Sequence, residues 1–456
     1  MSALPADRVT SLNPYVPDGR RLRILLLCDY DPTNAGTVVD NIDAFRTLSH
    51  HEYVVLSGRG NLLSGVNLKN VDGIFIHYSL VACYDSYLAP ETRRKIRTFQ
   101  GYKALYIQDE YRFIDQTIAA LEYMQIHALF SVVPPEARDR IYTAEKLPGV
   151  YKTTLLTGYV PDTLIGITTP PYAARSIDVS YRARKLPAYL GSHTLQKWQI
   201  ADKFNADARR YHLTVDISCR EEDRIYGVDW VKFVADSKAV LGTESGASVC
   251  DFTGKIQANV ERHMREHPEA SFDELHALYF AKEDGDIVIS CISPRCFEAA
   301  ALKTLMIMYE GEYSGVLTPW QHYVALKRDH SNMDEVVAVL RDPARAQKII
   351  DTAYQDLILS RRYSYRAMID MVDGVMEKLI TAGLKPSPLL RKASNKLLPI
   401  GLLSPVIFRI QKISQGLEYK FRALKYRMFN LLSRHPACKK LAKSLWLTLY
   451  PSSPKN

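Results

Sequence analysis

The most informative run of the chain spans residues 293–304 and reads Ser293-Pro-Arg-Cys-Phe-Glu-Ala-Ala-Ala-Leu-Lys-Thr304. The apolar residues just before it, Asp286 to Cys291, predict a strand, and serine followed by proline is typical of a helix N-terminus. The first turn of such a helix presents free backbone N–H groups and a positive dipole end, which suit a phosphate. Glu298, one turn further on, can accept two hydrogen bonds from a sugar diol. The run therefore predicts half of a nucleotide-sugar site, in which Ser293 and Arg295 contact the donor.

Apolar, β-rich runs alternate with helical stretches on both sides of this segment, which is the pattern of parallel α/β sheets. The Pro-rich segment 161–171 separates two such series, and we interpret it as a linker. The sequence therefore predicts the α/β class, with two Rossmann-like domains (residues 1–165 and 172–384) that face a cleft. The expected strands are Arg23–Cys28, Tyr53–Leu56, Gly73–His77, Ala104–Gln108, Ala128–Val133 and Thr153–Leu156, then Ile177–Ser180, His212–Ile217, Lys238–Leu241, Asp286–Cys291, Thr304–Tyr309 and His322–Leu326.

The positive charge is concentrated at the end of the chain. The whole chain carries +9, but residues 385–456 contain 15 Lys and Arg against one acidic residue, or +14, which leaves −5 for the rest. Apolar residues recur every three or four positions from 406 to 431, so we expect a basic amphipathic helical tail. Such helices commonly lie on anionic membrane surfaces. We expect residues 400–450 to bind such a surface, with packing on the protein's own body as the alternative. No nucleic-acid partner is expected, because an apolar stripe would not contribute to binding the phosphate backbone.

Several absences narrow the class of protein. The seven cysteines form no C-x-x-C pair, and the N-terminus has no apolar leader. No apolar run is long enough to span a bilayer. These features predict a cytoplasmic protein with reduced thiols, peripheral on the inner face of the membrane. No nucleophile motif, metal-ligand cluster or P-loop is present, so we expect neither a metal nor a cofactor.

The run 297–301, followed by Thr304, resembles the signature in the carboxy-terminal domain of group 1 GT-B glycosyltransferases (the GT4-like and CgeB-like branch). Two positions depart from it: Lys303 stands where glycine is common, and Ser290 where a second glutamate is common. The resemblance implies a GT-B fold and transfer from a nucleotide-sugar donor, which is a co-substrate. It also implies a retaining, metal-independent reaction. Together with the basic tail, it predicts a lipid-linked or cell-envelope glycan as acceptor.

In the first half of the chain, candidate residues lie where expected strands end, the usual place for ligands in such folds. Gly36 follows the first strand, where it allows close approach of the backbone to a diphosphate or is an ordinary turn glycine. His77 ends the third strand, and Asp109 and Glu110 end the fourth; these side chains can orient or deprotonate an acceptor hydroxyl, with Glu110 ranked below the other two. The alternative is that they are structural, with His77 packed at the strand end and Asp109 or Glu110 capping the next helix.

In the second half, the resemblance assigns Arg182, Arg184 and Lys185 to the donor diphosphate, with Lys197 in reserve. A basic solvent-exposed loop is the alternative interpretation. The loop Thr243–Ser248 follows an expected strand, and its Ser245 and Gly246 allow a backbone anion site. Its Glu244 is a candidate for the carboxylate missing at position 290, if residues 250–283 are an insertion. His322 is expected near the sugar or the hinge.

The catalytic candidates are therefore His77, Asp109 and Glu298. Two other functions stay open. The departures at Ser290 and Lys303 keep a catalytically degenerate GT-B scaffold at a membrane in consideration. A nucleotide-sugar epimerase or hydrolase would use the same fold and donor.

Overall fold

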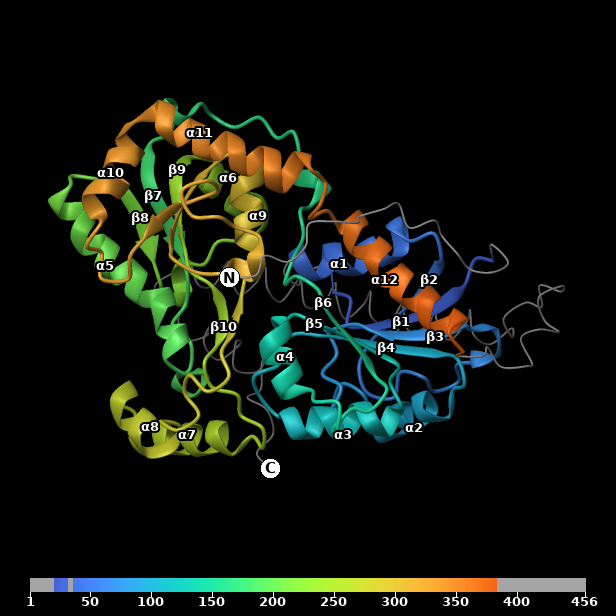
Figure 1. Cartoon of the computed structure of the whole chain (residues 1–456). Coiled ribbons are helices and arrows are strands. Elements are labelled where there is room, and N and C mark those ends of the chain that lie inside the picture. Colours follow the sequence, from blue (N-terminus) through green and yellow to red (C-terminus); the bar gives the residue numbers. More distant parts are fainter. Residues whose placement is uncertain (1–19, 32–35, 384–456) are drawn as a thin grey trace, which may run out of the picture. The chain divides into compact units, whose positions relative to one another are not determined.

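The computed structural model describes residues 20–31 and 36–383, which form two parallel β-sheets flanked by helices (Figure 1). This confirms the predicted α/β class with two Rossmann-like domains. The first sheet has the strand order β2-β1-β3-β4-β5-β6, and all its strands are parallel. Its strands are β1 (Arg23–Cys28), β2 (Glu52–Ser57), β3 (Gly73–Ile76), β4 (Tyr102–Ile107), β5 (Ala128–Ser131) and β6 (Tyr151–Thr154).

Helices cover both faces of the first sheet, so its central strands are apolar throughout (Figure 1). Helix α1 (Gly36–Leu48) and helix α12 (Tyr365–Thr381) pack side by side on one face. Helix α2 (Pro90–Thr98) and helix α3 (Ile114–Met124) lie on the other, and α4 (Pro135–Ile141) follows β5. Because α12 comes after the second domain in sequence, the first domain is completed by the last described helix.

The second sheet has the order β13-β12-β9-β7-β8 and is also parallel. Its core combines alternate strand residues with apolar residues of the surrounding helices. The strands are β7 (Ile177–Arg182), β8 (Val215–Ser218), β9 (Ser237–Gly242), β12 (Leu305–Tyr309) and β13 (Val324–Leu326). The helices are α5 (Gln196–Arg210), α6 (Gly227–Ala235), α9 (Pro294–Ala301), α10 (Met333–Arg341) and α11 (Pro343–Ala353).

The strand expected at 286–291 does not join this sheet. Only β11 (Ile289–Cys291) is extended there, and it pairs antiparallel with β10 (Ser245–Ala247) in a separate two-stranded ribbon. Ser290 lies opposite Gly246 in this pairing. The expectation that α9 follows a strand of the parallel sheet was wrong, because the pairing partner of a three-residue strand is set by distant residues. Helices α7 (Lys255–Glu266) and α8 (Phe272–Tyr279) lie between the two ribbon strands in sequence.

The chain crosses between the domains twice, and the two crossings contact each other. The Val160 amide donates to the Tyr363 carbonyl at 2.9 Å, and Val160 pairs with Ser364 in a short parallel contact. Arg361 also forms an ion pair with Asp162 at 2.9 Å. The first crossing contains the predicted Pro-rich linker. The second leads directly into α12, whereas the predicted boundaries grouped residues 172–384 in one domain.

The predicted basic tail, residues 385–456, lies outside the described residues, and so does its expected contact with a membrane. Within the described residues, no helix is both long and apolar enough to cross a bilayer.

Burial of α12 against the first sheet is testable with two methionines of the same helix. Met376 is 0% exposed in the core of the first domain, and Met371 is 46% exposed. We expect Met376→Ala to lower the free energy of unfolding by about 2–5 kcal/mol, because it leaves a cavity. The control Met371→Ala should change it by less than about 0.5 kcal/mol. Urea unfolding followed by circular dichroism measures both, and equal effects would show that α12 does not complete this core.

Candidate functional site

A cavity of about 800 Å³ lies where loops from both domains meet. The first domain contributes the loop after β4, and the second contributes the loop after β7, the ribbon strand β10 and the start of α9 at Pro294. Its volume falls within the range of roughly 300–1,000 Å³ that is usual for small-molecule sites. The predicted residues that line it are Asp109, Arg184, Lys185, Ser245 and Gly246.

The cavity is positively charged on the side of the second domain. Lys197, on α5, lines it and donates from Nζ to the Ser245 hydroxyl at 3.3 Å. Burial, then the positive charges of Arg295 and Arg184, lowers the pKa of Lys197 to about 8. Lys185 lies over the Trp198 ring, 5.0 Å from its centroid. These cations are held close together although they repel, an arrangement that favours binding of an anion.

Gly246 is required at its position by sterics. Its φ is 131°, and an added Cβ would lie 1.9 Å from the Ile289 carbonyl oxygen of the paired strand. Only glycine lets the ribbon strands approach this closely beside the cavity. Ser245 and Gly246 therefore both pair with β11 and line the cavity.

A second cavity, of about 390 Å³, lies within the first domain. It shares part of its lining with the larger cavity, so the segment after β4 separates the two. We call residues 108–113 the Asp109 loop. The residues that line both cavities are Gln108, Asp109, Glu110 and Arg112.

The Asp109 loop is held in an unusual backbone conformation. Asp109 has φ 58°, in the left-handed region that non-glycine residues rarely occupy, and Tyr111 donates its hydroxyl to Asp109 Oδ1 at 3.0 Å. The neighbouring Glu110 is buried and accepts from the Ser131 hydroxyl and the Val132 amide, each at 2.9 Å. Burial raises the pKa of Glu110 to about 7. The sequence analysis ranked Glu110 below Asp109 as a site residue, and in the structure Glu110 holds the loop against β5.

Glu298 lies one turn into α9. Pro294, at the start of that helix, lines the larger cavity, whereas Glu298 does not. The indole nitrogen of Trp230 donates to Glu298 Oε2 at 2.7 Å and orients the carboxylate. Burial raises the pKa of Glu298, an effect opposed by the Trp230 bond and by Arg295. The pKa of Asp40, on α1 in the first domain, is raised by burial and then by the negative charge of Asp43. The charge of Glu298 raises it further, as the smallest of the three causes.

Two predicted arginines are occupied by contacts within the second domain. Arg182 donates to the backbone carbonyls of Asp223 and Asp216, forms an ion pair with the Asp216 carboxylate at 2.8 Å, and does not line the larger cavity. Arg295 covers the Trp230 ring at 4.7 Å and donates to the Arg182 carbonyl. Of the predicted basic cluster, Arg184 and Lys185 thus line the cavity and Arg182 supports the loop.

The other predicted residues lie away from the lining of the larger cavity. Glu244 is buried and accepts the Tyr313 amide at 2.7 Å, which ties the loop after β9 to the loop after β12. His322 accepts the Thr318 amide at 3.0 Å and contacts Asp356 at 3.1 Å. Ser293 occupies the N-cap position of α9, but its side chain does not cap the helix.

In the first domain, His77 is fully buried between Asn41 and Ser79, at 3.0 and 2.9 Å. Burial lowers the pKa of His77 to about 3, which keeps the ring neutral. Gly36 is the first residue of α1 and has open space around it, so a side chain would meet no steric block there.

The expected pair of Rossmann-like domains is present. Two Rossmann-like domains both contribute to one cavity, with basic residues on the side of the second domain.

Similar solved structures share little sequence with this chain. The Anabaena protein HepE in complex with UDP is 9% identical, with a TM-score of 0.45 over 78% of this chain and 100% of its own. An E. coli structure of trehalose-6-phosphate bound with UDP-2-fluoro glucose is 9% identical, with a TM-score of 0.45 over 78% and 99%. The DNA-modifying enzyme β-glucosyltransferase is 11% identical, with a TM-score of 0.42 over 79% and 99%. No protein-family model matches the chain, and no curated protein does.

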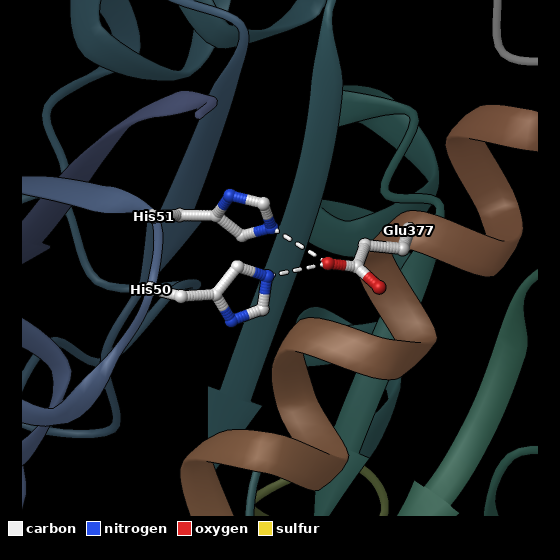
Figure 2. Close-up of side chains that lie close together, drawn as sticks. All are labelled: His50, His51 and Glu377. Carbon is white, nitrogen blue, oxygen red and sulfur yellow. Dashed lines mark hydrogen bonds and ion pairs between the residues drawn. The ribbon is translucent and has the colours of Figure 1, made fainter. Parts of the chain in front are cut away.

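Away from both cavities, His50, His51 and Glu377 point toward one another between the start of β2 and α12 (Figure 2). Glu377 Oε1 lies 2.6 Å from His50 Nε2 and 3.0 Å from His51 Nε2. The spacing would suit a metal ion, but the Leu22 amide donates to His51 Nδ1 at 3.2 Å. The His51 proton is therefore on Nε2, where a metal would have to bind. The cluster is a hydrogen-bonded attachment of α12 to the first domain.

Each cavity also contains one half-exposed thiol among the described cysteines. Cys83 lines the smaller cavity and Cys219 the larger one. Burial raises the pKa of both thiols, and Cys28, Cys250, Cys291 and Cys296 are buried.

Lys197 makes anion binding to the larger cavity depend on pH. An anion binds the protonated amine more tightly, so affinity is highest below the pKa of about 8 and falls as the pH rises above it. With inorganic pyrophosphate as probe, calorimetry should show Lys197→Ala weakening binding roughly tenfold at pH 7 and much less at pH 9.5. Pyrophosphate itself also titrates in this pH range. Lys197→Arg stays charged throughout, so the pH dependence of its affinity measures the contribution of the probe alone. A parallel pH dependence in wild type and Lys197→Arg would contradict the assignment.

Proposed function

We propose that this protein transfers a sugar from a nucleotide-sugar donor to a glycan or lipid-linked acceptor. The observation that carries the proposal is the cavity of about 800 Å³, which Arg184, Lys185 and Lys197 line together with the Asp109 loop. Cations on one wall suit a diphosphate, and a carboxylate on the other suits a hydroxyl acceptor.

In this proposal the second domain holds the donor. Arg184, Lys185 and Lys197 stabilise the negative charge that develops on the departing nucleoside diphosphate, and the first turn of α9 adds a positive dipole end. Glu298, oriented by Trp230, accepts hydrogen bonds from donor hydroxyls. These side chains supply positive charge and orientation themselves, so we propose a reaction without metal or cofactor.

The acceptor occupies the first domain in this proposal. The smaller cavity combines aromatic side chains, including Tyr78 and Phe113, with charged ones, a mixture that suits sugar rings. Asp109 lines both cavities and is the carboxylate best placed to orient an acceptor hydroxyl toward the donor. We propose a retaining outcome, which the anomeric configuration of the product would test by NMR.

The reaction can be tested with a panel of nucleoside-diphosphate sugars and saccharide acceptors. We expect one donor to release its nucleoside diphosphate with transfer of the sugar. Glu298→Ala and Arg184→Ala should each lower kcat/KM at least roughly tenfold, the effect of about 1.4 kcal/mol. Lys348→Ala, at an exposed position of α11, is the control.

The panel also separates the rival functions. Sugar isomer without free diphosphate would replace the proposal by an epimerase. Equal release with and without every acceptor would replace it by a hydrolase, and no turnover with any donor would favour a binding protein.

The basic tail leads us to propose that the protein works at the inner membrane face on a cell-envelope glycan. Its sequence places Lys420 and Lys425 beside the apolar stripe. Lys420→Glu with Lys425→Glu should reduce co-flotation of the full chain with anionic vesicles several-fold, since each lysine near such a surface contributes about 1 kcal/mol. Vesicles of neutral lipid are the control. Unchanged flotation would contradict membrane attraction through the tail.

A further inference from the structure

Residues 248–288 form an insertion between the ribbon strands β10 and β11. The insertion contains α7 and α8 and has its own small apolar core, with Val249, Val260, Leu275 and Phe280 as the buried residues. It belongs to the second domain by its position in the chain. Its first residues nevertheless contact the first domain.

The contact is made through backbone hydrogen bonds. The Asp251 amide donates to the Tyr111 carbonyl at 2.7 Å, and Asp251 pairs with Arg112 in a short parallel contact. A few residues on, the Asp115 amide donates to the Phe252 carbonyl at 2.9 Å. Residues 251–252 thus run alongside the end of the Asp109 loop and the start of α3.

The insertion is shaped to make this contact. The buried Asp251 carboxylate accepts the Gly254 and Gln257 amides at 2.8 and 2.9 Å, which starts α7 at this point. Gly254 has φ 80°, and an added Cβ would lie 2.5 Å from the Phe113 ring. Phe113 itself has φ 51° and lines the smaller cavity. Only glycine at 254 leaves room for that ring.

We propose that the insertion at residues 248–288 positions the Asp109 loop, so that the second domain sets the geometry of the acceptor side of the site. The proposal rests on the proposed function, because it assigns Asp109 to the acceptor. Asp251 and Gly254 are positioning residues: neither of them lines a cavity, and both act through Tyr111 to Phe113.

Gly254→Ala tests the proposal, with Gly285→Ala as a matched control. Both glycines lie in the insertion with positive φ, 80° and 88°, so alanine costs a similar backbone strain at each. An added Cβ meets the Phe113 ring at Gly254 and nothing within 4 Å at Gly285. Any difference between the two variants therefore reports the contact with the first domain.

The first measurement is amide hydrogen exchange, which needs no substrate. Gly254→Ala should speed exchange across residues 111–116 by roughly tenfold, the factor produced by about 1.4 kcal/mol, and Gly285→Ala should not. Adding Phe113→Leu to Gly254→Ala should restore part of the protection by relieving the clash. Equal exchange in the two glycine variants would overturn the proposal.

The second measurement separates positioning from general damage. Gly254→Ala should lower kcat/KM for the acceptor at least roughly tenfold, while pyrophosphate affinity at the basic wall changes less than about twofold. A parallel loss of acceptor turnover and pyrophosphate binding, or no loss of acceptor turnover, would overturn the positioning role. Wild-type protein without sugar transfer would instead refute the proposed function, and the exchange result would still show whether the docking exists.

Discussion

The first sheet has an apolar face that the chain before residue 165 covers only in part. Helix α1 covers one portion, and α12, some 200 residues after the sheet ends, supplies Met368, Ile369, Val372 and Met376 for the rest. Burying this face therefore requires the chain to return from the second domain. The return explains why two crossing segments lie against each other and why Ser49, His50 and His51 bond to carboxylates of α12.

The cavity depends on this arrangement because its two walls come from different domains. The second domain contributes cations, and burial, followed by the positive charges of Arg295 and Arg184, lowers the pKa of Lys197. The first domain contributes Asp109 in a strained conformation and a buried Glu110. Asp109, Arg184 and Lys197 line the same cavity, so one ligand can contact both domains at once.

The sequence predicted the strands of both sheets well, because strands buried on both faces read as short apolar runs bounded by turn residues. The errors concern which segments pack or pair with residues that are distant in the sequence. The apolar residues before Ser293 predict a strand, but not that Gly246 is its neighbour. The apolar face of α12 is equally legible, but nothing local says that it covers the first sheet.

The candidate site was predictable to a similar degree. A strand end identified Asp109, because the topology brings the carboxyl ends of parallel strands together, whereas the family resemblance identified Arg184 and Lys185. The sequence analysis ranked Arg182 above Lys197, but Lys197 lines the cavity and Arg182 does not. Only the packing shows that Asp216 and Asp223 occupy Arg182. The role of Glu110 as an anchor could not be predicted, because it depends on Ser131 and Val132, which are distant in sequence.

The thiols beside the two cavities have a consequence for oxidative chemistry. The thiolate is the form that reacts with oxidants and alkylating agents, and Cys83 and Cys219 have raised pKa values. Both thiols therefore stay protonated near neutral pH, although each lines a cavity that solvent can enter. A small thiolate fraction slows the oxidation of these two lining residues to sulfenic acid.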